Sequence, residues 1–460
     1  MDNQKLESIL NQIFEEMITA SNDEEYKYYL EEKRLMVLNY AKEHNLSVEE
    51  VLSRIKSYVP EVIEQYNRMK ETNEQKKNSS NSKFGVSICF EVIDLIEISK
   101  QCNNSEEFVK LRDEYIKKLG EDPRFQGFDY VFPGLREITY EEINKIYENL
   151  SNNVDCITPE WSGKMRCIID IRKPLFVDGD INMEIFNFEY LDKMANFARS
   201  NNMHLRMHNI VWHLDFRPIF ENATSEQIYR FLDVYMEEIA RRYSDILYSV
   251  DVLNEIASEI PGKMLRDSKW KDKLGDDYYI NILKIAKKHF PNIDVIYNEY
   301  GEEDPEKRKN IIAIIEKIKE VEERDGIILL DGLGIQSHYS VQTPDQSIKE
   351  AYFDFAKLGK KLQVTEFDVS NKGNQNEFNY QTNRVFRTVL DCAATFGIDL
   401  FNIWGVSSKI SWKSGKVDNF LDKNGNISKY SSKVIETYSE KKKTNTKNDS
   451  LNSEEIQQSK

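Results

Sequence analysis

The sequence lacks the features of a membrane protein or of a secreted, disulfide-bonded protein. Its 460 residues contain no run of about 18 apolar residues, so we expect no transmembrane helix. The opening MDNQKLESIL has no basic segment followed by an apolar core, which argues against a secretory signal. The cysteines are scattered, odd in number and without a CxxC pair, a pattern that indicates reduced thiols. We therefore expect a cytoplasmic protein. The cysteines are Cys89, Cys102, Cys156, Cys167 and Cys392.

Basic charge is also scarce. The chain has 63 Lys and Arg against 79 Asp and Glu, giving a net charge of -16. A nucleic-acid binder needs a basic surface to displace phosphate counterions, so we expect no nucleic-acid partner. We expect no membrane partner either. The hydrophobic content of 40% is enough for a globular core, and the 11% of aromatic residues suits either core packing or stacking against sugar rings.

Composition divides the chain into four parts. Apolar residues recur at helical spacing in residues 1–70, which predicts a small N-terminal α-helical domain and a candidate surface for self-association. Residues 71–83 contain no large apolar side chain and are predicted to be a flexible linker. Residues 84–439 hold the main domain. The polar segment 440–460 is predicted to be a disordered tail.

The main domain alternates short β-rich runs with longer amphipathic segments. Eight such runs predict an α/β fold, a closed (β/α)8 TIM barrel. An open doubly wound sheet is the alternative, but no glycine-rich phosphate loop follows the first run. Residues 103–136 read as an insertion after that run. The predicted strands are FGVSICF (84–90), VDCITPE (154–160), HLRMHNIVWH (204–213), SVDVLNE (249–255), DVIYNEY (294–300), GLGIQSHY (332–339), LQVTEFDV (362–369) and DLFNIWGV (399–406).

Most of these predicted strands end in polar or ionisable residues. In a barrel, the carboxyl ends of all strands meet on one face, where active sites form. One glutamate at a strand end is more often a loop residue or a salt-bridge partner, but a set of carboxylates, imidazoles and amides on six or more strands indicates a site. The set comprises Glu160, His208, His213, Asn254, Glu255, Asn298, Glu299, Gln336, His338, Glu366, Asp368 and Trp404.

Two carboxylates in this set suit glycoside cleavage. One carboxyl group protonates the leaving oxygen, and the other attacks the anomeric carbon or activates water. Glu255 and Glu366 lie on non-adjacent strands and are the candidates. Asn254 would hydrogen-bond a substrate hydroxyl. His338 would hydrogen-bond Glu366, with Asp368, on the same strand face as Glu366, orienting the imidazole.

The region from Phe84 to Tyr438 resembles glycoside hydrolase family 10, the xylanase family. HLRMHNIVWH is similar to the family segment R-G-H-x-L-V-W-H, DVLNE to W-D-V-V-N-E, and DGLGIQSHYS to I-D-G-I-G-x-Q-S-H. VTEFDVS is similar to I-T-E-L-D-I, and FNIWGVSSKISW to V-W-G-x-x-D-x-x-S-W. The resemblance implies retaining hydrolysis of β-1,4-linked, xylan-like oligosaccharides by double displacement, with no cofactor and no metal.

The resemblance also assigns roles to individual residues. It makes Glu255 the acid/base and Glu366 the nucleophile, with Asp368 in support. TPEWSGK resembles the family segment T-P-E-N-x-M-K, which would bring Glu160 and Lys164 to the sugar. The tryptophans that it places beside the sugar are also candidates for core packing. The substrate-binding residues that it implies are Glu160, Lys164, His208, Trp212, Asn254, Gln336, His338, Trp404 and Trp412.

Four residues depart from the family pattern. Trp161 stands in place of an Asn, Asp215 in place of a neutral amide, Met207 in place of a Gly, and Ser408 in place of an Asp. Positions 161 and 215 fall where members of the family bind the glycone sugars. We therefore expect this chain to keep the hydrolytic chemistry of the family and to differ in substrate recognition. We expect Asp215 to repel acidic decorations. We expect Trp161 to fill space beside the sugar or to provide a new stacking face. The alternative is that it packs against the segment after the first strand.

Other functions remain open at this point. One is a retaining β-glycosidase of the same fold with a different sugar specificity, and another is a carbohydrate-binding barrel that has lost catalysis. A metal hydrolase is disfavoured, because His208 and His213 are five residues apart on one predicted strand and should point to opposite faces.

Overall fold

The computed structural model describes the main domain. The chain divides into two units after residue 80, and the fold below is that of the second unit. The predicted N-terminal domain, most of the predicted linker and the predicted tail lie outside the described residues. The described residues are 82–121, 132–370, 375–410, 419–422 and 424–439.

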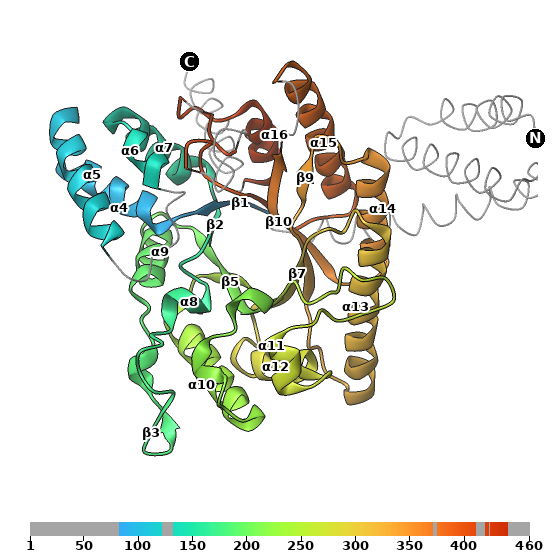
Figure 1. Cartoon of the computed structure of the whole chain (residues 1–460). Coiled ribbons are helices and arrows are strands. Elements are labelled where there is room, and N and C mark those ends of the chain that lie inside the picture. The colour runs from blue at the N-terminus through green and yellow to red at the C-terminus, as the bar shows by residue number, and fades with distance from the viewer. Residues whose placement is uncertain (1–81, 122–131, 371–374, 411–418, 423, 440–460) are drawn as a thin grey trace, which may run out of the picture. The chain divides into compact units, whose positions relative to one another are not determined.

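Eight parallel strands form a closed ring, which confirms the predicted (β/α)8 TIM barrel (Figure 1). The strands are β1 (Lys83–Ile88), β2 (Cys156–Pro159), β5 (His204–Trp212), β6 (Leu247–Asn254), β7 (Asp294–Glu299), β8 (Gly332–Ile335), β10 (Lys361–Ser370) and β11 (Leu400–Ile403). Each strand pairs with the next in this order, and β11 pairs with β1 to close the ring, with Phe84 opposite Phe401. Because helices cover such a barrel from outside, its strands are buried on both faces.

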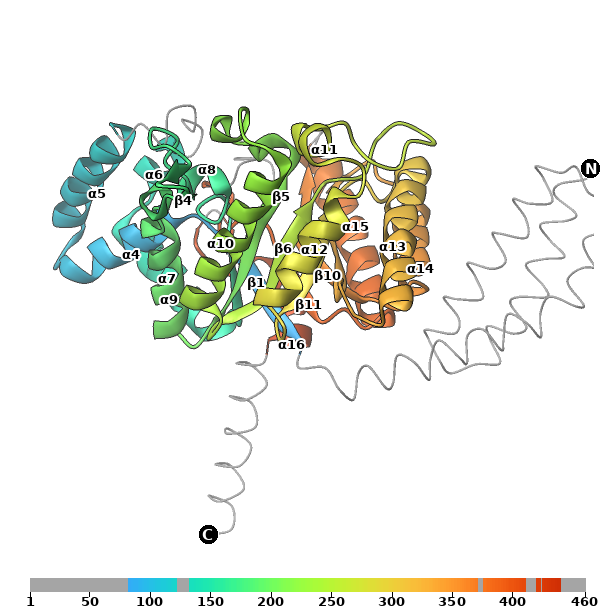
Figure 2. The same cartoon turned by 90° about the horizontal axis from the view of Figure 1, so that it is seen from below.

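Helices surround the strands in both views (Figures 1 and 2). Two of the helices begin at capping boxes, Thr139 with Glu142 and Thr224 with Gln227, which satisfy backbone N–H groups of the first turn. No described helix is long and apolar enough to cross a membrane. The main helices are α4 (Phe90–Gln101), α5 (Ser105–Gly120), α6 (Phe132–Glu137), α7 (Tyr140–Asn153), α9 (Glu189–Ser200), α10 (Ser225–Tyr243), α12 (Tyr278–His289), α13 (Pro305–Asp325), α14 (Asp345–Ala356), α15 (Gln375–Thr395) and α16 (Lys429–Tyr438).

Shorter elements fill the connections. A two-stranded hairpin of β3 (Phe176–Val177) and β4 (Asp180–Ile181) projects from the segment between β2 and β5 (Figure 1). The helices α8 (Met165–Ile168) and α11 (Lys269–Leu274) lie in the connections after β2 and β6. The five cysteines all fall in the described part of the chain, where each is buried and free of disulfides.

The predicted strands differ from the structure in their exact bounds, most clearly at the first and sixth strands. Lys83, assigned to the linker, is the first residue of β1, and β1 ends at Ile88 because α4 begins two residues later. The predicted run 332–339 is two strands, β8 and β9 (His338–Ser340), and β9 pairs with β10. The expected insertion 103–136 contains α5 and α6 in its described part.

The barrel interior is built around buried amide side chains. Asn402 accepts a hydrogen bond from Thr158 Oγ1 at 3.1 Å and donates to the carbonyl of Thr365 at 2.9 Å. Asn298 occupies the corresponding space beside Gly334. A Cβ atom on Gly334 would overlap Asn298 Oδ1 and lie 2.9 Å from Thr365 Cγ2. The glycine therefore leaves the room that Asn298 needs.

The Gly334→Ala substitution tests this packing. The added methyl group must displace buried side chains, so we expect the free energy of unfolding to fall by about 1–3 kcal/mol, as for other overpacked cores. Denaturant unfolding followed by circular dichroism measures the change. Gly120→Ala is the control, because nothing lies within 4 Å of its added Cβ and the residue ends helix α5. Equal stability of Gly334→Ala and the unchanged protein would contradict the packing argument.

Candidate active site

A cleft of about 450 Å³ lies where the carboxyl ends of several strands meet. Its walls come from residues at the ends of β5, β6 and β10 and from the segments that follow β2, β6, β7, β8 and β11. Most of the residues predicted from the sequence are brought together here, and Arg166 and Tyr300 join them. The lining residues are Glu160, Trp161, Lys164, Arg166, His208, Trp212, Asn254, Glu255, Tyr300, Gln336, His338, Glu366 and Trp404.

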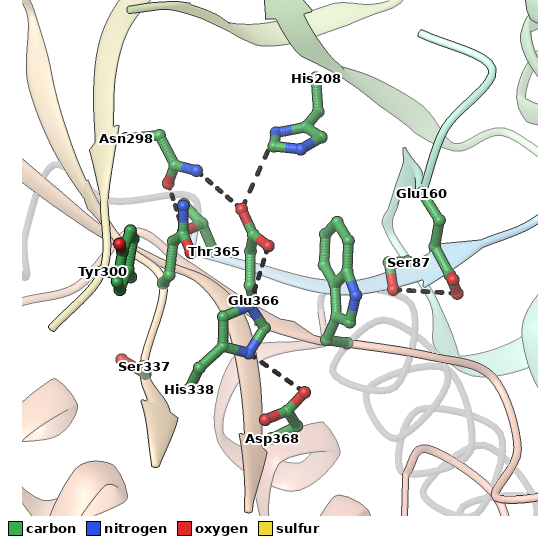
Figure 3. A network of polar contacts seen from close by, with 12 residues as sticks. Ser87, Glu160, His208, Asn298, Tyr300, Ser337, His338, Thr365, Glu366 and Asp368 are labelled. Carbon is green, nitrogen blue, oxygen red and sulfur yellow. Dashed lines mark hydrogen bonds and ion pairs between the residues drawn. The ribbon is translucent and has the colours of Figure 1, made fainter. Parts of the chain in front are cut away.

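The carboxylate of Glu366 is held by three side chains from three other strands (Figure 3). Asn298 Nδ2 donates to Glu366 Oε1 at 2.7 Å, and His338 Nε2 lies 3.1 Å from Oε2. His208 Nδ1 lies 3.8 Å from Oε1. Glu366 is only 5% exposed, so these contacts replace the water that an ionised carboxylate would otherwise bind.

The same contacts decide the charge of Glu366. Burial alone would raise the pKa of Glu366, but the attraction of His208 and the charge and hydrogen bond of His338 outweigh it and lower the pKa to about 2. Burial would lower the pKa of His338, but the charge and hydrogen bond of Asp368, together with Glu366, raise it to about 10. Asp368 Oδ2 lies 3.1 Å from His338 Nδ1. At neutral pH the site therefore holds an ionised Glu366 beside an imidazolium.

Asn298 links the two predicted catalytic segments, a role that the sequence analysis did not give it. Its Nδ2 also donates to Asn254 Oδ1 at 2.8 Å, and its Oδ1 accepts from Thr365 Oγ1 at 2.6 Å. Asn254 and Asn298 are paired in register on β6 and β7. Two asparagines at the ends of consecutive strands are the sequence signal for this contact.

Glu255 lies across the cleft in a different environment. Trp212 Nε1 donates to Glu255 Oε2 at 2.7 Å, and Gln336 Nε2 donates to Oε1 at 3.1 Å. His213 Nδ1 lies 3.7 Å from Oε2. Burial lowers the pKa of His213 to about 4, which leaves its imidazole neutral at neutral pH. The hydrogen bonds to Glu255 therefore come from neutral donors alone, whereas Glu366 is bound by the neutral amide of Asn298 and by the imidazolium of His338.

The backbone at Glu255 is strained. Its φ angle is 57°, in the left-handed region that residues other than glycine adopt at a cost of order 1–3 kcal/mol. The backbone N–H of Glu255 donates to Asn298 O at 2.9 Å, and Arg266 Nε donates to Glu255 O at 3.2 Å. These two bonds hold the turn that directs the Glu255 side chain into the cleft.

His208 is supported from inside the barrel. Its Nδ1 lies 2.7 Å from Asp251 Oδ2, and Asp251 forms a fully buried ion pair with Arg206. The expectation that His208 and His213 lie on one strand is wrong, because β5 ends at Trp212 and His213 begins a short 3-10 turn. The pairing of β5 with β6 also shifts register between His208 and Val211, so strict alternation does not hold along the strand. His208 lies beside Glu366, and His213 lies beside Glu255. No group of three metal-binding side chains occurs among the described residues.

Trp161 packs mainly against the segment that follows β1, as the alternative expectation had it. It is 4% exposed, its Nε1 donates to Glu91 Oε2 at 3.3 Å, and its ring centroid lies 6.4 Å from that of Phe90. Beside it, Glu160 accepts from Ser87 Oγ at 3.5 Å. Burial raises the pKa of Glu160 to about 7, so this carboxyl group is partly protonated at neutral pH.

Asp215 does not present a free carboxylate to the cleft, so the expected repulsion of acidic sugars from this residue is wrong. It is 1% exposed and accepts from the backbone N–H and the Nε of Arg166, both at 3.0 Å. Arg217 Nη1 lies 3.4 Å from the same carboxylate. Two arginines therefore neutralise Asp215, and one of them, Arg166, lines the cleft.

The remaining predicted tryptophan in the described part is Trp404. Its ring meets the imidazoles of His208 and His338 edge to face, with centroid distances of 5.5 Å and 6.1 Å. It therefore closes the cleft over both histidines. Trp412 lies outside the described residues, and its predicted contact with substrate stays a prediction.

The imidazolium of His338 can be observed directly. We expect NMR of histidine-labelled protein to show one of the six histidines still protonated well above pH 8, because the pKa of His338 is raised to about 10. Asp368→Asn removes the charge that stabilises the imidazolium, so this pKa should fall. Asp276→Asn, at an 83% exposed side chain, is the control. An unchanged titration in Asp368→Asn would refute the role of Asp368.

Comparison with known proteins agrees with the fold described above. Residues 133–437 match the family model described as glycosyl hydrolase family 10. Endo-1,4-beta-xylanase A of Caldicellulosiruptor saccharolyticus is 30% identical over 261 residues, which cover 51% of this chain and 72% of that enzyme. Beta-1,4-xylanase of Dictyoglomus thermophilum is 30% identical over 235 residues, covering 51% of this chain and 62% of that enzyme.

Solved structures show the same fold. A mutant described as a complex with xylotriose is 25% identical, with a TM-score of 0.57, and covers 78% of this chain and 98% of its own. The endo-1,4-beta-xylanase of Caldicellulosiruptor owensensis, at 23% identity and a TM-score of 0.56, shares the barrel over 78% of this chain and 98% of its own. The family match covers more than half of the sequence, and the chain therefore belongs to glycosyl hydrolase family 10 and is a glycoside hydrolase similar to endo-1,4-beta-xylanases.

Proposed function

We propose that this enzyme hydrolyses β-1,4-linked, xylan-like oligosaccharides with retention of configuration. Glu366 attacks the anomeric carbon while Glu255 protonates the leaving oxygen, and a covalent glycosyl-enzyme forms. Glu255 then takes a proton from water, which attacks the same carbon and releases the sugar from Glu366. The xylanase names of the relatives support the substrate class.

One observation carries this proposal, namely the unequal surroundings of the two carboxyl groups. Glu366 has a pKa of about 2 and lies beside cationic His338, so it is an ionised nucleophile at any working pH. Glu255 accepts hydrogen bonds from the neutral groups of Trp212 and Gln336. Two carboxyl groups in different environments are the arrangement that separates a nucleophile from an acid/base.

Retention is tested by the configuration of the first product. We expect proton NMR during hydrolysis of xylo-oligosaccharides to show the β-anomer of the new reducing end first, with the α-anomer appearing later by mutarotation. Double displacement inverts the anomeric carbon twice, which gives this order. An initial α-product would mean that water attacks directly and that Glu366 is not a nucleophile.

Substitution separates the two roles. Glu366→Ala should abolish turnover of every substrate, because no nucleophile remains. Glu255→Ala should slow natural oligosaccharides by about 10²–10⁴-fold, the usual contribution of a general acid, and spare aryl glycosides whose leaving groups need little protonation. Added azide should restore release of the sugar from the covalent intermediate and give a glycosyl azide.

Glu221→Ala is the matched control for these variants, since this glutamate is exposed and pairs with Lys269 away from the cleft. Turnover should match that of the unchanged enzyme. If Glu255→Ala lost activated and natural substrates equally and azide had no effect, Glu255 would not be the acid/base.

A further inference from the structure

Arg166 is held firmly at the edge of the cleft. Its Nε donates to the buried carboxylate of Asp215 at 3.0 Å, and its Nη2 donates to the carbonyl of Leu214 at 2.8 Å. Its side chain is 29% exposed and lines the cleft. Within the described part of the chain, Nη1 has no acceptor in hydrogen-bonding distance. The guanidinium therefore has a fixed orientation and unused donors.

A second cation lies beside it. Lys164 Nζ is 4.7 Å from the ring centroid of Trp212, and Arg166 Cζ is 5.4 Å from the same ring. Among the described residues, Lys164 Nζ makes no hydrogen bond or ion pair. Both cations are in contact with the cleft, whereas the acidic Asp215 is buried and already paired with Arg166 and Arg217. Two cations thus face the cleft around Trp212, close to the partly protonated Glu160 and to Glu255.

We propose that Arg166 makes the enzyme selective for oligosaccharides in which a sugar bound beside Trp212 carries a carboxylate. A guanidinium fixed at one edge pairs well with a carboxylate through its free N–H groups, and partial burial strengthens such a charge-assisted bond. Lys164 adds a second positive charge on the same side. The proposal rests on the proposed glycosidase function and narrows its substrate class to acidic oligosaccharides.

Calorimetry and kinetics test the selectivity together. Binding of xylotriose, and of xylotriose with a glucuronic acid branch, is measured on the Glu366→Ala variant, and kcat/KM is measured on the unchanged enzyme. We expect the branched sugar to bind about tenfold more tightly and to be hydrolysed with the higher kcat/KM. Added salt should reduce the difference, because it screens the partly exposed pair.

Variants then assign the effect to Arg166. Arg166→Gln should abolish the preference, so that this variant binds the branched sugar no more tightly than xylotriose. Arg166→Lys keeps the positive charge but loses the paired N–H donors of the guanidinium, so this variant should retain part of the preference. Arg217→Gln is the matched control, because Arg217 also pairs with Asp215 but does not line the cleft, and the preference should persist. Thermal unfolding of each variant shows whether the fold is kept.

The outcomes separate the two proposals. Equal binding of the two sugars, or an Arg166→Gln variant that loses both equally, would overturn the selectivity even if xylotriose is hydrolysed with retention. A clear preference in binding without hydrolysis of either sugar would support the selectivity and overturn the proposed reaction. A sulfated xylotriose that binds more tightly than the glucuronyl sugar would overturn the assignment to a carboxylate.

Discussion

The hydrogen bond from Asn298 to Glu366 is the contact on which the catalytic end of the barrel depends. The amide fits only because Gly334 has no side chain, and Thr365 fixes its orientation by donating to its oxygen. Its two N–H groups then bind Glu366 and Asn254. A buried carboxylate is costly unless it is hydrogen-bonded. Core packing around one glycine thus sets the position of the Glu366 carboxylate.

A network of ionisable side chains surrounds this carboxylate. Glu366 lies between two imidazoles, and each imidazole also contacts an aspartate. His338 contacts Glu366 through Nε2 and Asp368 through Nδ1, whereas Nδ1 of His208 lies near both Glu366 and Asp251. In such a buried network each charge depends on its neighbours, because the interior does not screen an unpaired charge. The ionised state of Glu366 is therefore a property of the whole chain of contacts, contributed by four strands, rather than of one neighbouring residue.

The sequence predicted the parts of the site that depend on strand position. The alternation of β-rich and amphipathic segments gave the barrel, and the strand ends placed Glu255 and Glu366 at one face. The sequence could not predict which side chains bind each other. Arg166 and Asp215, for example, are hydrogen-bonded although they lie 49 residues apart in the chain. The sequence prediction also missed the register shift in β5, because strict alternation was assumed between His208 and the end of that strand.

At one wall of the cleft, the residue type alone predicted the wrong sign of charge. The departure from the family pattern at position 215 shows why. An aspartate at position 215 suggested negative charge, but burial forced it to pair, and its partner Arg166 brings positive charge to the surface instead. Trp212 connects this wall to Glu255, because its ring lies near Arg166 and its N–H donates to the carboxylate of Glu255. Within the described part of the chain, Arg166 has no contact with Glu366. The contacts of Arg166 are therefore separate from the contacts with His338 and Asn298 that hold the ionised Glu366.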